Sequence, residues 1–462
     1  MAEAKVLIVS DRSCLIKFDS DRIAYMFKHS ISTTNLGLEV IRIPLKNIES
    51  VVVLALSNTG SRYEEPNKQG IAHFFEHMVF KGTEKYPDAQ TLAKTVDSIG
   101  ADFNAFTSKE YTGYYVKSAS VHLELAMDVL SDMLLSPKLR QTDIDLEKGV
   151  IIEELNMYVD NPARHIGNLF DQMIYRGSGL SHDIIGQKET INSMLSADFR
   201  DFLKKWYGLG NLVLVVAGDE KVVGSQDLME KIDQYFTKDG GERQGKVNIT
   251  DRLCPQGPVS QERLLVESRQ TQQAHFILGW PGIKRKDPRR YALSVLSTIL
   301  GGNMSSRLFS EIRERRGLCY YINSGIDQFH DGGVLAVSAG VDLKRVDEAI
   351  QTTLSEFGNL FNGTKAISQE ELTRARDYLI GKMVLSFEDS ESLAQYYGLK
   401  QILNGSIETP EQVVEKLKAV TLDDLESLVK ELIVHDETRF AITGPYQERE
   451  VHFASQLKMV GW

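Results

Sequence analysis

The chain has little cysteine and no long apolar run. Its 462 residues include three cysteines, Cys14, Cys254 and Cys319, which are too few and too scattered for a disulfide framework or a thiolate metal cage. The longest purely apolar stretches, such as residues 51–56, are far shorter than the ~20 residues of a membrane-spanning helix. We therefore expect no membrane association, and any bound metal must be held by histidine, aspartate or glutamate.

Positive charge is in deficit as well. Lysine and arginine number 53 against 64 aspartates and glutamates, which gives a net charge of −11. This balance, without a basic run or zinc-finger spacing, argues against nucleic-acid binding. The N-terminus carries charges around a very short apolar stretch and has no secretory cleavage pattern, so we expect a cytoplasmic location. The 42% of hydrophobic residues is typical of a globular protein.

A stretch near the midpoint divides the chain in two. Residues 237–262 are rich in Gly, Pro, Asp and Gln and have no hydrophobic periodicity, so we interpret them as an interdomain linker. On either side lies one copy of a repeat, because residues 118–123 (SASVHL) match residues 338–343 (SAGVDL). The predicted organisation is an N-terminal extension, a metal-binding half, the linker and a metal-free half, at residues 1–30, 31–236, 237–262 and 263–462.

The pattern within each half predicts the fold class. A strand (50–57 or 273–279) precedes a helix, and in the first half residues 101–107 and 111–118 follow as a hairpin. Long helical patterns come next, including residues 142–158. Strands interspersed with helices and hairpins predict an α+β fold in which each half is a mixed, mainly antiparallel sheet covered by helices.

The most informative segment is residues 70–83, GIAHFFEHMVFKGT. Its apolar spacing and closing glycine predict a helix that carries His73 and His77, four residues apart, on one face together with Glu76. A zinc ion is bound by neutral imidazoles and a carboxylate with one position left for water, whose proton a nearby free carboxylate can accept. His-x-x-Glu-His is a known zinc-peptidase motif. The alternative is a buried helix whose histidines only form hydrogen bonds.

A third ligand is expected from the helix at residues 142–158. At about 100° per residue, Glu147 and Glu154 fall on its apolar side, whereas Glu153 points about 100° away. A carboxylate on an apolar stripe needs a partner. Zinc would serve Glu154, and Glu147 could orient a ligating histidine. Both could instead be surface glutamates, and Glu153 is the rival for the ligand role.

The repeat sharpens this interpretation. At the same offset the second copy has Leu293, Leu296 and Ser297 where the first has the two histidines and Glu76. Leucine and serine at these positions of the second copy show that the fold can form without the histidines. Only the first half can hold the metal, and the polar trio therefore needs another explanation.

Several ordered motifs resemble one family. HFFEHMVFKGT, EKGVIIEE, GADFNAFTSKEYTGYY and SSRLFSEIRERRGLCY together make the chain similar to the pitrilysin/insulinase family of inverzincin metallopeptidases. The nearest subgroup is the bacterial enzymes similar to the β subunit of mitochondrial processing peptidase. The resemblance covers about residues 30–445. It implies two halves that close like a clamshell around an unfolded peptide.

The resemblance also implies residue roles. One zinc per chain would be bound by His73, His77 and Glu154, with Glu76 as the general base and Glu147 as a supporting glutamate. The peptide would add as a strand to a sheet edge, and an Arg and a Tyr of the second half would reach across to it. The matching residues are Phe103, Asn104, Ala105 and Phe106 for the edge, and Arg313 and Tyr320 for the pair. Without the resemblance, Arg313 could compensate a helix dipole and Tyr320 could be a core residue.

The resulting hypothesis is a zinc endopeptidase that cleaves peptides, possibly basic ones, or unfolded segments in a chamber between the halves. We expect it to act as a homodimer. The alternatives are a noncatalytic structural or assembly subunit and the catalytic half of a heterodimeric processing peptidase. The sequence assigns no role to the N-terminal extension.

Overall fold

The computed structural model describes residues 28–236, 245–250, 253–254, 257 and 259–459. The predicted extension at residues 1–30 lies almost entirely outside the described residues, and the predicted linker lies partly outside them. In the described part of the chain, no helix is both long enough and apolar enough to cross a membrane.

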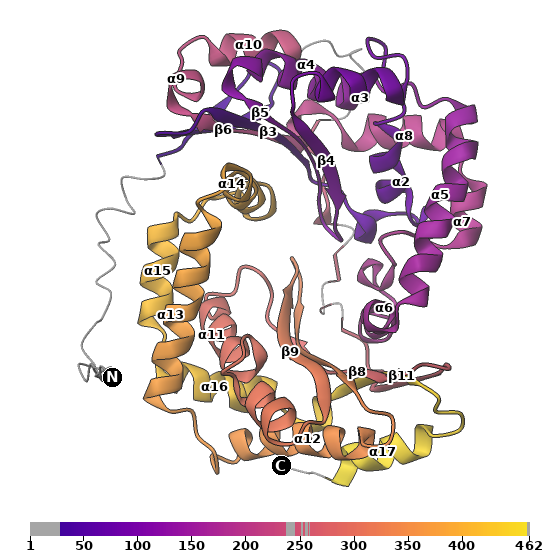
Figure 1. The fold of residues 1–462 in the computed structure, drawn as a ribbon, viewed down its shortest axis with the longest axis vertical. Helices are drawn as coiled ribbons and strands as arrows, with labels where there is room; N and C mark the ends of the chain where they lie inside the picture. Colours follow the sequence, from indigo (N-terminus) through magenta and orange to yellow (C-terminus); the bar gives the residue numbers. More distant parts are fainter. Residues whose placement is uncertain (1–27, 237–244, 251–252, 255–256, 258, 460–462) are drawn as a thin grey trace, which may run out of the picture.

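The first half is built on a six-stranded sheet, which lies in the upper part of Figure 1. Only β2 and β6 run parallel, and every other neighbouring pair is antiparallel. In spatial order the strands are β1 (Ser30–Thr33), β2 (Glu39–Leu45), β6 (Leu212–Asp219), β3 (Ser50–Ser57), β5 (Thr112–Ala119) and β4 (Asp102–Thr107).

The second half repeats this topology with five strands. Its one parallel pair is β7 and β11, which correspond to β2 and β6. In spatial order the strands are β7 (Leu264–Ser268), β11 (Arg439–Gly444), β8 (Ala274–Gly282), β10 (Gly333–Val341) and β9 (Cys319–Gln328). The expectation of two similar halves, each with a mixed and mainly antiparallel sheet, is confirmed.

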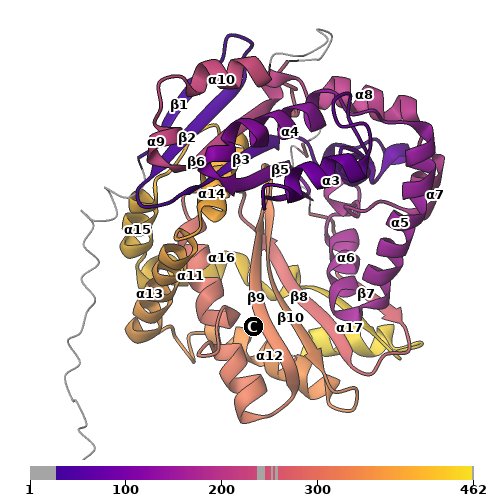
Figure 2. The ribbon, with the colours of Figure 1, turned by 45° about the horizontal axis from the view of Figure 1, so that its top comes forward.

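Helices cover both sheets (Figures 1 and 2). Those of the first half are α2 (Ile71–Met78), α3 (Ala89–Asp97), α4 (Leu123–Leu135), α5 (Gln141–Asp160), α6 (Pro162–Ile174), α7 (Lys188–Ser193), α8 (Ser196–Trp206), α9 (Glu220–Val223) and α10 (Leu228–Tyr235). Those of the second half are α11 (Arg290–Gly301), the π-helical turn η7 (Phe309–Arg315), α12 (Val346–Phe361), α13 (Gln369–Ser386), α14 (Ser390–Asn404), α15 (Pro410–Ala419), α16 (Leu422–Leu432) and α17 (Glu450–Met459).

One predicted helix is shorter than its sequence pattern. The pattern extends to Gly82, but α2 ends at Met78 and the chain turns through the next four residues. The Thr83 side chain, just beyond, donates a hydrogen bond to Asp132, and Lys138 N donates to Gly82 O. These contacts hold the turn in place, and the apolar pattern continues after the helix because Val79 and Phe80 pack on the core of the first half.

Each sheet packs against a helix from the opposite half. Val52, Leu54 and Leu56 of β3 form a buried cluster with Leu393 and Tyr397 of α14, which lies directly beneath the first sheet (Figures 1 and 2). The approach is close because Gly398 faces the sheet: a Cβ there would lie 2.5 Å from Leu56 Cδ1.

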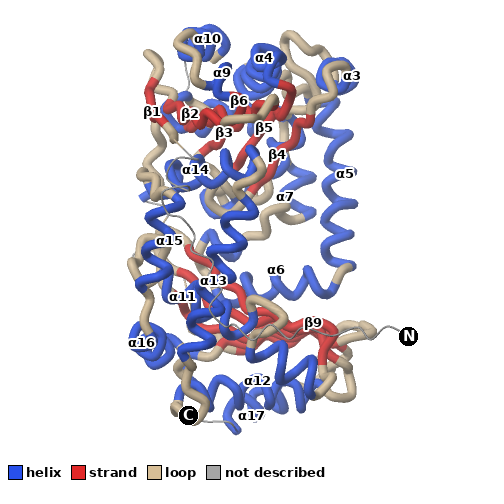
Figure 3. Tube along the Cα trace, turned by 60° about the vertical axis from the view of Figure 1, so that its left-hand side comes forward, coloured by secondary structure: helices blue, strands red, loops and turns tan. Residues whose placement is uncertain are grey.

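The exchange is reciprocal. Phe170 and Met173 of α6 pack with Ile277, Val334 and Ala441 of the second sheet. Gly279 of β8 permits this contact, because a Cβ there would lie 2.8 Å from Phe170 Cζ. Helix α5 runs along one side of the molecule and α6 turns from its end toward the second sheet (Figure 3). Neither sheet is therefore fully covered by its own half.

A buried ion network also joins the halves. The Arg62 guanidinium, with a side chain that is 0% exposed, donates to Glu110 at 2.6 Å and to Asp331 of the β9–β10 turn at 2.8 Å. Arg285 also pairs with Glu110. Buried charges of both signs satisfy one another here, and removing one would leave the others unpaired at a cost of about 3–5 kcal/mol.

The helix exchange gives a stability prediction. Leu393→Ala should lower the free energy of unfolding by about 2–5 kcal/mol, because a fully buried side chain is lost from the contact between α14 and the first sheet. Chemical denaturation followed by circular dichroism measures this. The control is Leu385→Ala, since Leu385 is 63% exposed on α13 and should change stability by about 0.5 kcal/mol or less. Equal stability of the two variants would contradict the role assigned to α14.

Candidate metal centre

The position of α2 is set at its first turn. The Glu64 carboxylate accepts hydrogen bonds from Gly70 N at 2.7 Å and Ala72 N at 2.9 Å, which satisfies backbone donors that a helix start leaves free. Burial raises the pKa of Glu64 to about 8, although the two N–H groups favour the carboxylate. Glu64 thus anchors the helix that carries the histidine motif.

Three predicted ligands converge where α2 packs against α5. One ligand atom from each of His73, His77 and Glu154 lies within 4.8 Å of the others. His73 Nε2 is 3.7 Å from Glu154 Oε1, and His77 Nε2 is 3.5 Å from Glu154 Oε2. Both distances exceed a normal hydrogen bond. They match the roughly 3.4 Å between two ligand atoms that share a tetrahedral zinc ion at about 2.1 Å each.

His77 is held by a chain of charged groups. Its Nδ1 lies 2.9 Å from Glu147 Oε1, and Lys81 Nζ lies 2.6 Å from Glu147 Oε2. Burial would raise the pKa of Glu147, but the hydrogen bonds from His77 and Lys81 outweigh it and hold the pKa below its ordinary value. With Nδ1 donating to this carboxylate, the His77 lone pair is on Nε2 and faces Glu154, as a metal ligand requires.

His73 is suited to metal binding by its neutral state. Burial, and then the proximity of His77, lowers the pKa of His73 to about 3, so the imidazole carries a lone pair at neutral pH. Its Nδ1 is buried and has no hydrogen-bond partner among the described atoms. Together, two imidazoles and a carboxylate form the donor set of a zinc site with an open position.

Glu76 stands beside the three ligands without joining them. The Thr107 hydroxyl, at the end of β4, donates a hydrogen bond to Glu76 Oε2. Burial raises the pKa of Glu76, and Glu154 adds to the increase, whereas Thr107 and His77 oppose it. A half-buried carboxylate with one oxygen anchored and the other free is suited to accept a proton.

The structure distinguishes the candidate glutamates. Glu153 is exposed, whereas Glu154 faces the histidines and Glu147 is 5% exposed. Glu147 is therefore not a surface glutamate. In the second half, Leu293 and Leu296 are fully buried in the core. His73, His77 and Glu154 form the one group of this kind among the described residues.

The predicted substrate edge lies next to this centre. β4 pairs with β5 along one side and ends the sheet, so its other side has free backbone groups. It contacts α2, and just after that helix the Phe80 ring lies 5.3 Å from the Phe103 ring of β4. Ala105 packs on the same core as Phe103, whereas Phe106 packs on the opposite face and Asn104 is exposed.

Arg313 and Tyr320 lie on the second half. The Arg313 guanidinium stacks over the Phe309 ring at 4.6 Å within η7, and Tyr320 is 75% exposed on the edge strand β9. In the described part of the chain, no hydrogen bond or ion pair joins either residue to the metal centre. The exposure of Tyr320 shows that it is not a core residue. Its role and that of Arg313 stay predictions.

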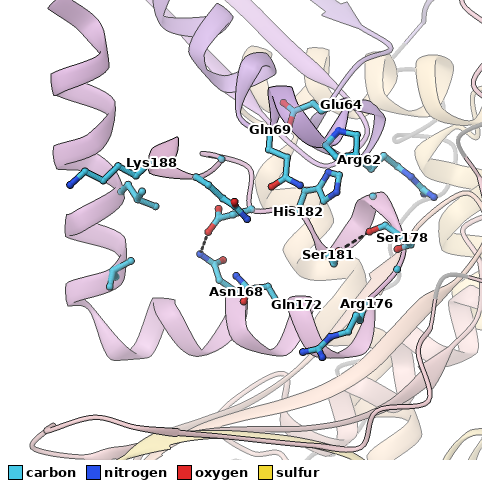
Figure 4. A pocket seen from close by; sticks show the side chains of 18 of the residues that line it. Arg62, Glu64, Gln69, Asn168, Gln172, Arg176, Ser178, Ser181, His182 and Lys188 are labelled. Atoms are coloured by element: carbon cyan, nitrogen blue, oxygen red, sulfur yellow. Dashed lines mark hydrogen bonds between the residues drawn. The ribbon is translucent and has the colours of Figure 1, made fainter. Parts of the chain in front are cut away.

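A pocket of about 850 Å³, lined mostly by polar side chains, lies along α6. None of the three candidate ligands lines it, and Leu155 and Val159 of α5 belong to its wall. Asn168 and Gln172 project into it from α6, and Gln69 and His182 face them from the opposite side (Figure 4). The pocket could hold polar groups of a molecule bound at the metal centre.

Three supporting residues were missed in the sequence. Lys81 lies four residues after His77, and this helical spacing was an available signal. Thr107 ends a predicted strand, and Glu64 precedes a predicted helix without occupying its N-cap position. No local sequence pattern predicted a role for Thr107 or Glu64, because each contacts a partner in another element.

The chain is similar to known proteins over most of its length. A family model described as insulinase, peptidase family M16, matches residues 46–188, and one described as the peptidase M16 inactive domain matches residues 195–379. An uncharacterized zinc protease of Bacillus subtilis is 33% identical over 86% of this chain and 94% of its own length. Another, from Streptomyces coelicolor, is 31% identical over 90% of this chain and 89% of its own length.

Solved structures share the fold. A protease from Helicobacter pylori is similar with a TM-score of 0.83 and 24% identity, over 91% of this chain and all of its own. A Pseudomonas fluorescens structure described as a peptidase M16 inactive domain has a TM-score of 0.80 and 19% identity, over 91% of this chain and 98% of its own. The two-half architecture therefore occurs in proteins of low sequence identity.

Two adjacent glutamates test the ligand assignment. Glu154→Gln should weaken zinc binding by more than the ~10–100-fold that loss of an outer-shell partner costs. Glu153→Gln should bind zinc as the unmodified protein does, because its side chain is exposed. Competition of the metal-free proteins with a chromophoric chelator measures both affinities. Weaker binding in the Glu153 variant alone would reverse the assignment.

A matched pair of lysines tests the charged chain behind His77. Lys81→Met should lower zinc affinity about 10-fold, because Glu147 then loses the cation that favours its ionised form. Lys85→Met is the control: Lys85 pairs with the buried Asp128 in the same way but away from the centre. The same chelator competition should show unchanged affinity for the Lys85 variant. Equal affinities for the two variants would exclude the role of Lys81.

Proposed function

We propose that this chain, which belongs to the insulinase (M16) family of peptidases, is a zinc metalloendopeptidase that cleaves peptides and unfolded protein segments. The observation that carries the proposal is the convergence of His73, His77 and Glu154 on one point beside the Glu76 carboxylate, which is not one of the three converging groups. Structural glutamates and histidines would not need this arrangement. One zinc ion per chain is proposed, because the donor set occurs once in the described residues.

The chemistry divides between the metal and the protein. Zinc in such a site supplies Lewis acidity, which acidifies water and polarises a carbonyl group. Glu76 accepts the water proton at its free oxygen and donates it to the leaving amine. His77 keeps its orientation through Glu147, whose charge Lys81 balances. His73 stays neutral through burial and therefore remains able to bind the metal.

We propose that the substrate binds as an added strand along β4. The outer backbone edge of Phe103, Asn104, Ala105 and Phe106 would hydrogen-bond to an extended peptide, which gives affinity that depends little on side chains. Ala105 N donates to Asn104 Oδ1 at 2.8 Å in the absence of a peptide, so the Asn104 side chain would have to release it. A folded protein cannot offer such a strand. The polar pocket along α6 would take side chains of the bound peptide.

The second half would complete the substrate site. Arg313 and Tyr320 are proposed to contact the peptide from the opposite side of a chamber between the halves. The net charge of −11 would favour basic peptides if the acidic surplus lines this chamber. A homodimer is proposed as the active form.

Two alternatives remain distinct from this proposal. A noncatalytic assembly subunit would not require the full set of His73, Glu76, His77 and Glu154. A catalytic subunit of a heterodimer would need a second chain to cleave peptides. Having the ligands, the base and the Arg313–Tyr320 pair in one chain favours a self-sufficient enzyme.

The central test is Glu76→Gln. The variant should retain zinc but cleave peptides at least ~100-fold more slowly, because its amide cannot accept the water proton. A peptide library digested with and without a zinc chelator, and read by mass spectrometry, gives activity, metal dependence and preference for basic sequences. Near-normal turnover by the variant would overturn the base assignment. Zinc-loaded protein that cleaves no library peptide would favour the noncatalytic alternative.

A further inference from the structure

The base of the proposed reaction is tied to the proposed substrate strand by a single side chain. Thr107 is the last residue of β4, and its hydroxyl donates to Glu76 Oε2. Phe103, Ala105 and Thr107 alternate onto the face of β4 that is directed at α2, and the Phe103 ring meets Phe80, two residues after the end of that helix. One end of the strand thus packs on the turn that follows α2, and the other is joined to α2 itself by a charge-assisted hydrogen bond.

The strand end that carries Thr107 is itself fixed. Thr107 pairs with Thr112 of β5, and the Thr112 hydroxyl donates to Thr59 O at 3.0 Å. Beneath this pair, the hydroxyls of Tyr114 and Tyr207 lie 2.6 Å apart in the buried core. Thr107 therefore holds Glu76 from a rigid backbone position, whereas the outer backbone of β4 stays open.

The terminal torsion of a glutamate is soft, with broad and nearly two-fold preferences. A free Glu76 carboxylate could rotate away from the point where the three ligands converge. With Oε2 bound to Thr107, one orientation is selected and Oε1 remains available to accept a proton. A general base must lie within hydrogen-bond reach of its proton, and a misplacement of about 1 Å can cost roughly 100-fold in rate.

We propose that Thr107 is a positioning residue of the peptidase reaction, which sets the orientation of the Glu76 carboxylate and couples it to the strand on which the peptide docks. This inference rests on the proposed function. A peptide that pairs with β4 then binds to the same rigid strand that orients the base. The position of the scissile bond relative to the Glu76 carboxylate is therefore fixed by one element.

The test compares two threonines. Thr107→Val keeps the shape and branching of the side chain but removes the hydroxyl, and Thr107→Ser keeps the hydroxyl. Thr443→Val is the matched control, because Thr443 on β11 also donates from a strand to a glutamate, Glu267, at 2.6 Å in the other half. For each variant, kcat and KM on a cleaved peptide, the zinc affinity of the metal-free protein and a crystal structure with zinc are determined.

Thr107→Val should lower kcat by about 10–100-fold, change KM by less than about 3-fold and leave zinc affinity unchanged, while its structure shows the Glu76 carboxylate rotated or split between orientations. Thr107→Ser should restore kcat, and Thr443→Val should match the unmodified enzyme. An unchanged kcat with Glu76 in place would overturn the inference, as would a loss that appears in zinc affinity or KM instead of kcat.

The activity of the unmodified protein separates this inference from the proposed function. If the proposed function is wrong, the unmodified, zinc-loaded protein cleaves no peptide. If only the role of Thr107 is wrong, the enzyme is active and its kcat does not depend on the Thr107 hydroxyl. If activity is absent, the orientation of Glu76 in crystal structures of the unmodified protein and of Thr107→Val still decides whether Thr107 holds the carboxylate.

Discussion

The architecture depends on one packing constraint: each sheet has two apolar faces, and the helices of its own half cover only one. β3 is buried on both sides, with alternate residues in two separate clusters. The second face of the first sheet is covered by α14, and a face of the second sheet by α6. Leaving either apolar face in water would cost free energy, so the chain must cross between the halves. Helix α5 makes that crossing.

The metal centre follows from this crossing. On its way toward the second half, α5 packs against α2 and brings Glu147 and Glu154 to the two histidines. A buried carboxylate requires a partner, and Glu147 has two, His77 and Lys81. Glu154 lies opposite the two imidazole Nε2 atoms, at distances too long for hydrogen bonds. Of these two glutamates, it is therefore Glu154 whose partner is incomplete and which is the candidate metal ligand.

Local patterns predicted the elements well. The strand at 50–57, the hairpin and the long helix at 142–158 were read from periodicity, and the structure has β3, β4–β5 and α5 there. The helical phase separated Glu153 from Glu154 in direction, and the exposure of Glu153 agrees. The predicted length of α2 was wrong by four residues, because Val79 and Phe80 pack on the core from a turn and not from the helix.

The sequence by itself determined which half carries the candidate ligand set, because a ligand set is a matter of side-chain identity: His73, Glu76 and His77 have Leu293, Leu296 and Ser297 as counterparts in the second copy. It also determined the repeat and hence the two similar halves. Only the tertiary structure decided which helices cover which sheet, and that Lys81 and Thr107 hold the groups beside the ligands. The physical reason is that periodicity records which face of an element is buried but not against which partner, and partners so far apart along the chain are chosen by packing.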